Sequence, residues 1–362
     1  MSGVWGKNIK LSIFGESHGN AIGITIDGLL PGIELDIDYI KRELERRMPG
    51  KNKLSTARKE ADQFEILSGY FNNKTTGSPL SAIIRNSDQH SKDYSKLKNL
   101  MRPGHADYTG NIRYKGFNDY RGGGHFSGRI TAPLVFAGAV AKQILAEKGI
   151  LIGSHIKSIA NVEDESFDKV NIEDSLLSDL LKEEFPTINK EKGVEMRKLI
   201  IDAKGELDSV GGVVETAVLN LPVGIGSPFF YSVESHLSHM IFSIPAVKGI
   251  EFGEGFDISK LRGSEANDEY YMENDKVKTR TNNNGGILGG ITNGMPIVFR
   301  TAFKPTASIA RLQHTIDIEK HENAELEITG RHDPCIVQRA VPVVEAAAAI
   351  AILDLMLSLI HI

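Results

Sequence analysis

The 362-residue sequence predicts an α+β fold made of two related halves, in which helices pack against mainly antiparallel sheets. Three observations lead to this prediction. Short segments alternate apolar and other residues with the period of two that is typical of strands. Similar segments recur in the same order in both halves of the chain. Each half then ends in an Ala-rich run, which indicates a closely packed core helix because long side chains would hold the helix axes apart.

The first half opens with residues 19–36, "GNAIGITIDGLLPGIELD", which predict a strand followed by a Leu-Pro and Gly-Ile turn. Residues 36–48 predict a helix that ends before Pro49, because proline lacks the N–H donor and clashes with the preceding turn. Residues 66–85 predict a strand, a Gly-bearing turn and a second strand. The half closes with an Ala-rich helix over residues 129–145, which carries a proline suited to its first turn.

The second half repeats these segments in the same order, at residues 211–228, 232–244, 287–300 and 339–355. Chance recurrence of Leu-Pro-Gly and alanine runs is the alternative. The shared order instead favours an internal duplication, with repeats at about 10–150 and 210–358. The segment at about 163–205 is polar, so we expect it to be a peripheral connection. No G-x-G-x-x-G fingerprint or P-loop follows a strand, which argues against a nucleotide-binding Rossmann unit.

The composition is that of an ordinary soluble globular protein, with 41% hydrophobic residues, 25% charged residues and a net charge of -5. This balance argues against a nucleic-acid-binding protein, so any anion site must be local. One cysteine, Cys335, excludes an internal disulfide, and the absence of a leader pattern predicts a cytoplasmic protein. Residues 341–360 are long enough to span a membrane, but Glu345 and Asp354 interrupt them and favour a buried helix.

Three loop segments concentrate residue types suited to catalysis: "FGESHG" (14–19), residues 102–129 and "GRHDPC" (330–335). They contain His18, His105, His125 and Asp333, and histidine is the side chain best able to exchange protons near neutral pH. Each histidine could equally be a surface or capped residue. Glu16 and Asp107 are expected to cap or pair locally, and the four arginines of 102–129 could form a solvated basic face.

Two specific kinds of catalytic site are alternatives for these loops, a zinc site and a Ser-His-Asp triad. A zinc site could draw on His18, His105, His125, His332 and Cys335, but no C-x-x-C pair or H-E-x-x-H helix is present, so no metal is expected. A Ser-His-Asp triad could use Ser17 or Ser127. Neither serine lies in a G-x-S-x-G elbow, and a triad is recognised by geometry that a sequence does not contain.

The remaining pattern indicates an anion site with proton donors. Arg47, Arg102 and Arg129 lie beside glycine-rich turns, and their guanidinium forks suit a small substrate with several negative groups. "KPTAS" (304–308) indicates a second phosphate cradle, and two anion sites imply two ligands. Glycines would let the backbone lie flat against a planar ring such as that of flavin mononucleotide. These glycines are residues 122–124, 285, 286, 289 and 290.

The motifs "GESHG", "RPGHADYTG", "YRGGGHFSGR", "GGILGG", "KPTAS" and "GRHDPC…RAVPVVEA" together resemble those of the chorismate synthase family, from about residue 7 to 355. The resemblance implies one domain over residues 1–362, folded as a β-α-β sandwich with Ala-rich central helices between antiparallel sheets, and assembled as a homotetramer. It implies a lyase that eliminates phosphate from 5-enolpyruvylshikimate 3-phosphate in a 1,4-anti reaction to give chorismate. The family requires reduced FMN although the reaction has no net redox change, and it binds neither nucleic acid nor membrane.

The resemblance also implies roles for individual residues. His18 would protonate the reduced flavin, His105 would assist the departing phosphate, and Asp333 would help flavin N5 act as the base. The substrate's phosphate and carboxylates would bind Arg47, Arg102 and Arg129, and family descriptions place NADP contacts at Arg47 and Lys53. The FMN site would comprise His125, Phe126, Ser127, Ala246, Gly289, Lys304, Pro305, Thr306, Ala307, Ser308 and Arg331.

Two positions depart from the family pattern. Lys53 stands where arginine is frequent, which replaces a guanidinium fork with a point charge and weakens any NADP contact. Pro245 stands where asparagine is frequent, which removes an amide and a backbone donor from the flavin site. We expect NADPH to act only indirectly, through an external flavin reductase. A bifunctional enzyme that reduces its own flavin and a catalytically silent phosphometabolite-binding protein are the alternatives.

Overall fold

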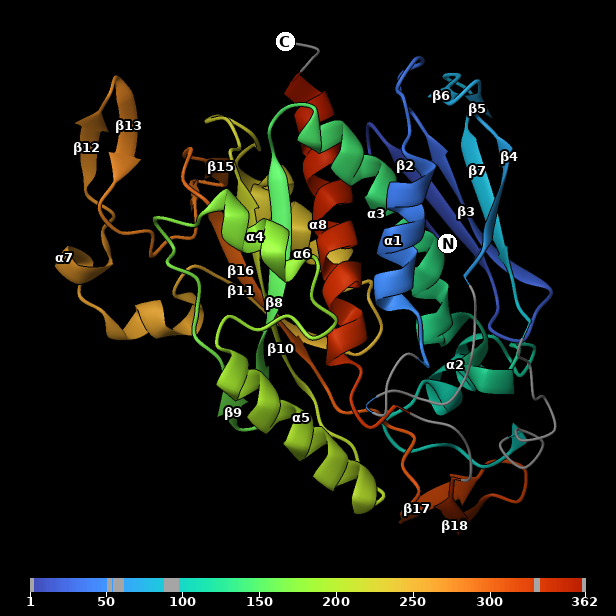
Figure 1. The fold of residues 1–362 in the computed structure, drawn as a ribbon. Coiled ribbons are helices and arrows are strands. Elements are labelled where there is room, and N and C mark those ends of the chain that lie inside the picture. The colour runs from blue at the N-terminus through green and yellow to red at the C-terminus, as the bar shows by residue number, and fades with distance from the viewer. Residues whose placement is uncertain (1–2, 51–53, 55–61, 88–97, 329–332, 360–362) are drawn as a thin grey trace.

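A computed structural model describes residues 3–50, 54, 62–87, 98–328 and 333–359. It forms three layers, with helices between two five-stranded antiparallel sheets (Figure 1). The helical layer contains α1 (Ile37–Arg47), α3 (Thr131–Ala146) and α8 (Val337–Leu359). This arrangement confirms the predicted α+β class and the Ala-rich helices between antiparallel sheets.

The first sheet has the strand order β1-β2-β3-β7-β4, and every neighbouring pair is antiparallel. Its central strand β3 pairs Ile24 with Ile13 on one side and with Ala82 on the other. Ile22, Ile24 and Ile26 of β3 are all buried. The strands are β1 (Val4–Trp5), β2 (Lys10–Gly15), β3 (Ala21–Asp27), β4 (Phe64–Ser68) and β7 (Leu80–Arg85), and the hairpin β5 (Tyr70–Phe71) with β6 (Lys74–Thr75) lies between the last two.

The second sheet has the strand order β11-β16-β10-β8-β9 and is also antiparallel throughout. Its strands β10 and β8 change register at Val213 and Val214, where a bulge interrupts the ladder. The strands are β8 (Leu151–Ile159), β9 (Val162–Glu163), β10 (Gly212–Leu219), β11 (Val247–Phe252) and β16 (Ile297–Phe303).

The two sheets share one connectivity, which supports the predicted duplication. In the first sheet β2, β3, β7 and β4 are neighbours, and in the second β8, β10, β16 and β11 follow the same order. Helices α1 and α6 (Val233–Ile241) each follow the second of these strands, and α3 and α8 each follow the last in sequence. The duplication itself stays a prediction.

The hairpin expected within residues 287–300 differs from the observed one. The strands that pair with β16 are β10 and β11, and the nearer of them, β11, precedes it by some 45 residues of chain. Residues 287–292 instead form the small hairpin β14 (Ile287–Leu288) and β15 (Ile291–Thr292). Gly289 and Gly290, with φ of 61° and 84°, make the tight turn of this small hairpin. The glycines therefore do form a turn, as predicted, but it joins the strands of this small separate hairpin and not two strands of the second sheet.

Helices α3 and α8 pack side by side at the centre of the molecule, with backbones in close approach (Figure 1). A Cβ atom on Gly138 of α3 would lie 2.2 Å from the Cβ of Ala346 in α8 and 2.3 Å from its Cα. Nearly every residue of both helices is buried. The glycine and the alanines thus set the separation of the helices, as the Ala-rich runs predicted.

Substitution of Gly138 by alanine should lower the free energy of unfolding by about 1 to 3 kcal/mol, because the added methyl overpacks the α3–α8 contact. Alanine's better helix propensity, worth about 1 kcal/mol, offsets only part of this loss. Urea denaturation followed by circular dichroism measures the change. Gly205→Ala is the matched control, because Gly205 ends α5 and its Cβ would meet no atom within 4 Å. Equal stability of the two variants would contradict the close approach.

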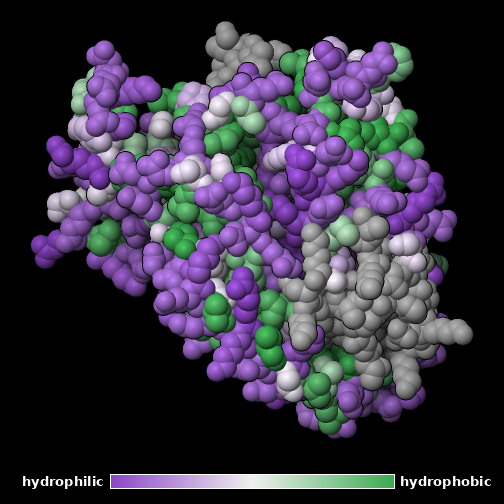
Figure 2. Space-filling model, in the orientation of Figure 1, coloured by the Kyte–Doolittle hydropathy of each residue, from purple (hydrophilic) through white to green (hydrophobic). Residues whose placement is uncertain are grey.

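The acidic residues that interrupt the apolar C-terminal helix have buried partners. Glu345 lies with its side chain fully buried, 2.6 Å from Lys142 Nζ and 2.6 Å from Arg46 Nη1. The carboxylate of Asp354 accepts hydrogen bonds from the backbone N–H groups of Asn8 and Ile9, both at 2.7 Å. Two helical windows, 128–146 and 337–358, are apolar enough to cross a membrane, but 89% of each is buried inside the protein. Figure 2 shows one face of the molecule, on which most residues are hydrophilic.

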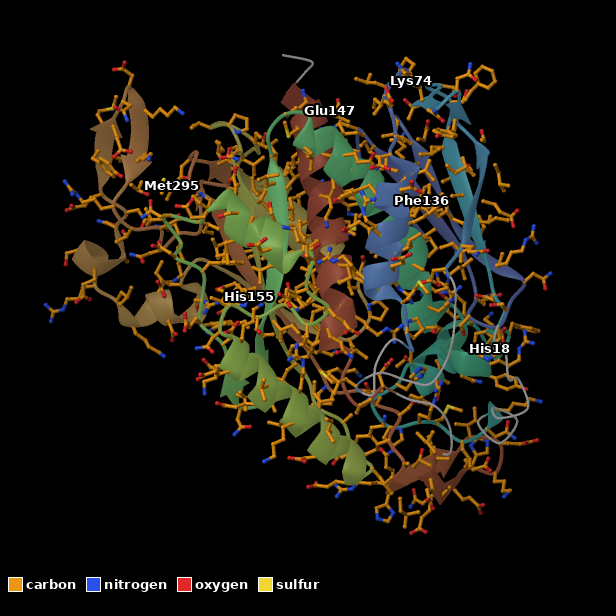
Figure 3. All side chains as sticks on the ribbon, in the orientation of Figure 1. His18, Lys74, Phe136, Glu147, His155 and Met295 are labelled. Carbon is orange, nitrogen blue, oxygen red and sulfur yellow. The ribbon has the colours of Figure 1, made fainter. Side chains whose placement is uncertain are left out.

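The segment between the halves covers the outer face of the second sheet. Phe167 and Leu177 pack with Ala217 and Val298 of the sheet in a separate apolar cluster. His155 of β8, labelled in Figure 3, lies fully buried between Asp164 and Glu215, at 3.1 and 2.9 Å from their carboxylate oxygens. The remaining elements are α2 (Asp107–Arg113), α4 (Asp174–Leu180), α5 (Lys190–Gly205), α7 (Gly263–Ala266), β12 (Tyr270–Glu273), β13 (Lys276–Thr279), β17 (Leu312–Asp317) and β18 (Glu322–Glu327).

Candidate active site

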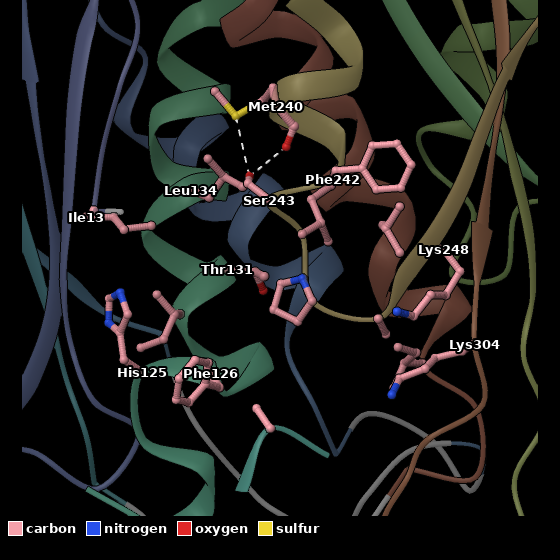
Figure 4. A pocket seen from close by; sticks show the side chains of 18 of the residues that line it. Ile13, His125, Phe126, Thr131, Leu134, Met240, Phe242, Ser243, Lys248 and Lys304 are labelled. Atoms are coloured by element: carbon pink, nitrogen blue, oxygen red, sulfur yellow. Dashed lines mark hydrogen bonds between the residues drawn. The ribbon is translucent and has the colours of Figure 1, made fainter. Parts of the chain in front are cut away.

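A cavity of about 800 Å³ lies between the first sheet, the N-terminal end of α3 and the α6–β11 connection. Most of its wall is apolar, and Figure 4 shows His125 and Phe126 on one side with Lys248 and Lys304 on the other. Its apolar lining includes Trp5, Leu11, Ile13, Ile24, Ile130, Leu134, Met240 and Ile244. This combination can take a flat apolar group with a negative charge at one end.

Two sequence-predicted loops meet at this cavity, although about 200 residues separate them. His105, His125 and Phe126 line it from the first loop, and the Lys304 side chain of the second loop donates a hydrogen bond to the Gly104 carbonyl. Of the predicted cofactor residues, those that line the cavity are His125, Phe126, Ala246, Lys304, Pro305, Thr306 and Ala307.

The three consecutive glycines of "RGGGH" all adopt positive φ, at 59°, 90° and 54° for Gly122, Gly123 and Gly124. A Cβ on Gly122 would lie 2.1 Å from His18 Cε1, and one on Gly123 would lie 3.2 Å from His105 Nε2. A Cβ on Gly124 would lie 2.1 Å from the Asp119 carbonyl oxygen. These glycines therefore let the loop approach both histidines closely, and the expectation that they lie flat against a planar ring stays a prediction.

His18 lies behind the glycine loop, away from the lining of the cavity. It is 5% exposed, and its Nδ1 is 3.1 Å from the Ser17 hydroxyl oxygen. The backbone N–H of Ser17 donates to the Gly124 carbonyl, which fixes the "GESHG" segment against the glycine loop. The structure thus brings His18 and His105 to opposite sides of one loop.

His105 is held by an arginine–carboxylate pair. Its Nδ1 lies 2.7 Å from Asp107 Oδ1. Arg102 donates hydrogen bonds to the same carboxylate from Nε at 2.7 Å and from Nη2 at 2.8 Å. Burial by itself would raise the pKa of Asp107, but hydrogen bonds from Arg102 and His105 hold it well below its usual range. Asp107 therefore stays ionised at neutral pH, and Arg102 is already occupied by a carboxylate.

Arg47 and Arg129 converge on one buried carboxylate. Asp62 Oδ2 lies 2.6 Å from Arg47 Nη1, and Asp62 Oδ1 pairs with Arg129 Nη1. Arg47 Nε also donates to the hydroxyl of Thr131, a cavity residue, at 3.0 Å. Burial, reinforced by the nearby positive charges of Arg339 and Arg129, lowers the pKa of Arg47 to about 10 despite the Asp62 charge. Neither arginine lines the cavity in this conformation.

Asp333 belongs to the same arginine cluster and not to the lining of the cavity. Its carboxylate pairs with Arg339 Nη1, and Arg339 Nε donates to the Arg47 carbonyl at 3.0 Å. Lys53, Arg331 and His332 lie outside the described residues, so the structure places none of them.

Three predicted cofactor residues lie away from the cavity wall. Ser127 accepts a hydrogen bond from the Arg129 backbone N–H at 3.3 Å. Ser308 is buried, with its hydroxyl oxygen 3.5 Å from Arg102 Nη1. Gly289 lies in the β14–β15 turn, where an added Cβ would meet no atom within 4 Å. Its neighbours Gly285, Gly286 and Gly290 instead pack closely against other parts of this chain.

Sequence reasoning missed Lys248, which lines the cavity opposite His125 (Figure 4). The one indication in the sequence is that Lys248 lies two residues after Ala246, a predicted FMN-site residue. Ala246 itself has a φ of 73°, uncommon for a residue other than glycine, and its carbonyl accepts a hydrogen bond from the Lys304 N–H at 3.0 Å. Pro245 also lines the cavity, and its backbone has no N–H to offer a ligand.

The zinc alternative has no assembled ligand set among the residues that the structure describes, where no group of three or more His, Cys, Asp or Glu side chains could hold a metal ion. Cys335 is fully buried, and burial raises the pKa of its thiol to about 12. It is therefore an inert core thiol at neutral pH.

Comparisons with known proteins identify the family of this chain. The model of the family "Chorismate synthase" matches residues 9–357. The chorismate synthase of Thermococcus kodakarensis is 47% identical over 350 residues, which cover 96% of each chain, and that of Dehalococcoides mccartyi is 46% identical over 357 residues, 99% of this chain and 97% of the relative. A solved structure titled "Crystal Structure of Chorismate Synthase" superposes with a TM-score of 0.77 at 31% identity, covering 98% of this chain and 93% of that one. The chain therefore belongs to the chorismate synthase family, whose members are carbon–oxygen lyases.

Proposed function

We propose that the protein converts 5-enolpyruvylshikimate 3-phosphate to chorismate by an FMNH2-dependent 1,4-anti elimination of phosphate. One observation carries this proposal: in a member of this family, the loops that contain His105 and Lys304 meet at one large, mostly apolar cavity. A proton donor and a phosphate-binding lysine thereby share one enclosed space. That is the minimum an elimination of phosphate requires.

The cavity fits a reduced flavin mononucleotide. Its apolar lining suits a planar ring, and Lys304 and Lys248 supply positive charge for one phosphate. Thr306 Oγ1 is buried and has no hydrogen-bond partner in the described part of the chain, so it is available to a ligand. We propose that His125, Phe126, Ala246 and residues 304–307 hold the flavin, and that Ser127, Gly289, Ser308 and Arg331 complete the site. Reduced FMN, when bound, supplies electron density to the substrate and a base for the ring hydrogen.

His105 is the proposed acid for the departing phosphate. It lines the cavity, and general acid catalysis by a positioned histidine contributes about 10²- to 10⁴-fold. Arg102 lies beside it and would stabilise the charge that develops on the phosphate. We propose that His18 holds a proton beneath the glycine loop and that Asp333 orients the base side of the site.

The proposed carboxylate-binding residues of the substrate site are Arg47, Arg129 and Lys53. In the ligand-free chain both arginines bind Asp62, so a substrate carboxylate must compete with that internal anion. The competition favours substrates with more than one negative group, because a single anion offers no more charge than Asp62 already does.

The test is anaerobic incubation of the purified protein with chemically reduced FMN and 5-enolpyruvylshikimate 3-phosphate. We expect chorismate and inorganic phosphate in equal amounts, read by absorbance and by a phosphate assay. Binding of the substrate without product under full reduction would instead support the catalytically silent binding protein. Sustained turnover in air with NADPH and FMN alone would show that the chain reduces its own flavin, against our proposal of an external reductase.

We further propose a homotetramer that works in the cytoplasm. Phe229, Phe230 and Phe256 are 85%, 89% and 83% exposed, and large exposed aromatic residues are typical of subunit interfaces. The two apolar helices are buried within the subunit, which supports a protein free of the membrane. Light scattering on the purified protein tests the tetramer, and cell fractionation tests the location.

A further inference from the structure

We propose that Asp107 is a positioning residue that fixes the His105 imidazole with its proton on Nδ1 and its Nε2 edge open to the cavity. The orientation stands on the geometry alone, and its catalytic consequence rests on the proposed function. Asp107 begins α2, two residues after His105, so helix and histidine are set by one short stretch of chain.

The Asp107 carboxylate is itself held rigidly. Arg102 donates to it from Nε at 2.7 Å, from Nη2 at 2.8 Å and from its backbone N–H at 3.1 Å. The side chains of Arg102 and Asp107 are 3% and 8% exposed, so water competes little for these bonds. A bidentate guanidinium–carboxylate pair of this kind fixes both the plane and the position of the acceptor oxygens.

This carboxylate decides which ring nitrogen of His105 carries the proton. Asp107 is ionised and can only accept, and its Oδ1 lies 2.7 Å from His105 Nδ1. An unprotonated Nδ1 would place two lone pairs against each other at that distance. Arg102 Nη2 also lies 3.2 Å from Nδ1, but the negatively charged Asp107 oxygen is closer and needs a proton on Nδ1. The neutral imidazole is therefore the Nδ1–H tautomer, with an unprotonated Nε2.

The Nε2 edge is left accessible by the glycine loop. A Cβ on Gly123 would lie 3.2 Å from both Nε2 and Cε1, so glycine is the residue that leaves this edge uncovered. Among the described residues Nε2 has no hydrogen-bond partner, and His105 contributes to the cavity wall. Arg102, Asp107 and, from the end of β16, Lys304 are the charged groups around it.

In the proposed reaction, the imidazolium gives its Nε2 proton to an oxygen of the leaving phosphate. The carbon–oxygen bond breaks and its electron pair stays on that oxygen. The ring hydrogen leaves as a proton, and the electron pair of its C–H bond enters the new double-bond system. The imidazole becomes neutral and keeps Nδ1–H toward Asp107. Asp107 remains ionised throughout. Its fixed position aims Nε2.

The test is a double-mutant cycle between Asp107 and His105. Asp107→Asn keeps the shape but offers an N–H donor that permits the wrong tautomer, so kcat should fall by about 10²-fold with a much smaller change in KM. In an H105A background, D107N should change kcat by less than about threefold, because a residue that acts through His105 has nothing left to position. A full D107N effect in that background would overturn the proposal.

A second measurement keeps the inference testable if D107N folds poorly. ¹⁵N NMR of histidine-labelled wild-type protein at alkaline pH should report His105 as the Nδ1–H tautomer, and a predominant Nε2–H form would overturn the proposal without any assay of turnover. Glu65→Gln is the matched control, because Glu65 binds Arg85 with two oxygens in a similar pair on the surface. It should leave kcat and the His105 signals unchanged. If wild-type protein makes no chorismate but shows the Nδ1–H tautomer, the proposed function is contradicted and the inference about Asp107 is not.

Discussion

Replacement of His105 by alanine is expected to lower kcat by at least about 10²-fold, and by up to about 10⁴-fold, while KM for 5-enolpyruvylshikimate 3-phosphate changes little. His105 lines the cavity, and its Nε2 has no hydrogen-bond partner among the described residues. Its loss removes the proposed acid but leaves the carboxylate-binding arginines in place. An interaction made only in the transition state lowers kcat and kcat/KM together.

Anaerobic stopped-flow measurement of chorismate formation gives both kinetic constants for this variant. His314→Ala is the matched control, because the side chain of His314 on β17 is 91% exposed and lies outside the site. Turnover of the H105A protein within about threefold of wild type would remove His105 from the mechanism. Large losses in both variants would point to misfolding, which circular dichroism detects.

Replacement of Lys142 by methionine is expected to lower the free energy of unfolding by about 3 to 5 kcal/mol, because it leaves a buried carboxylate without its cation. Lys142 Nζ lies 2.6 Å from both Glu43 and Glu345, and Arg46 supplies the second cation of this cluster. Burial by itself would lower the pKa of Lys142, but the two carboxylates raise it well above its ordinary value. Methionine fills a similar volume, so the loss reports charge and not a cavity.

Urea denaturation measures this change, and the double variant K142M/E345Q should recover part of the loss, because it removes one unpaired charge. Lys41→Met is the control, since Lys41 and Asp38 form a pair with side chains 58% and 75% exposed, and surface pairs of this kind contribute about 0 to 1 kcal/mol. A loss in K142M no larger than that in K41M would show that the buried cluster adds nothing to stability.

Local signals in the sequence predicted the helices well. The segment expected over 36–48 is the helix Ile37–Arg47, and Pro49 ends it through the missing donor. The Ala-rich runs predicted both central helices, and Gly138 shows why: the helices touch through their backbones. Composition and period are properties of short stretches, so they were available without tertiary information.

The parts that were not predicted depend on partners distant in sequence. Asp62 joins Arg47, 15 residues away, to Arg129, 67 residues away, and no pattern in the sequence marks that convergence. The strand β11 was not predicted, because β16, the strand that pairs with it, follows only after a long intervening segment. The glycines of the 121–129 loop suggested a ligand, whereas the neighbours that require them are two histidines and a backbone carbonyl.

The hydrogen bonds from the first strand region to Asp354 join residues 346 positions apart. At a ribosomal rate of about 5 to 20 residues per second, Asn8 is made roughly 20 to 70 s before Asp354. During that interval α3 can already pack on the first sheet, whereas the contact with α8 cannot form. The hydrogen bonds between residues 7–9 and α8 therefore form only late in the synthesis of this chain.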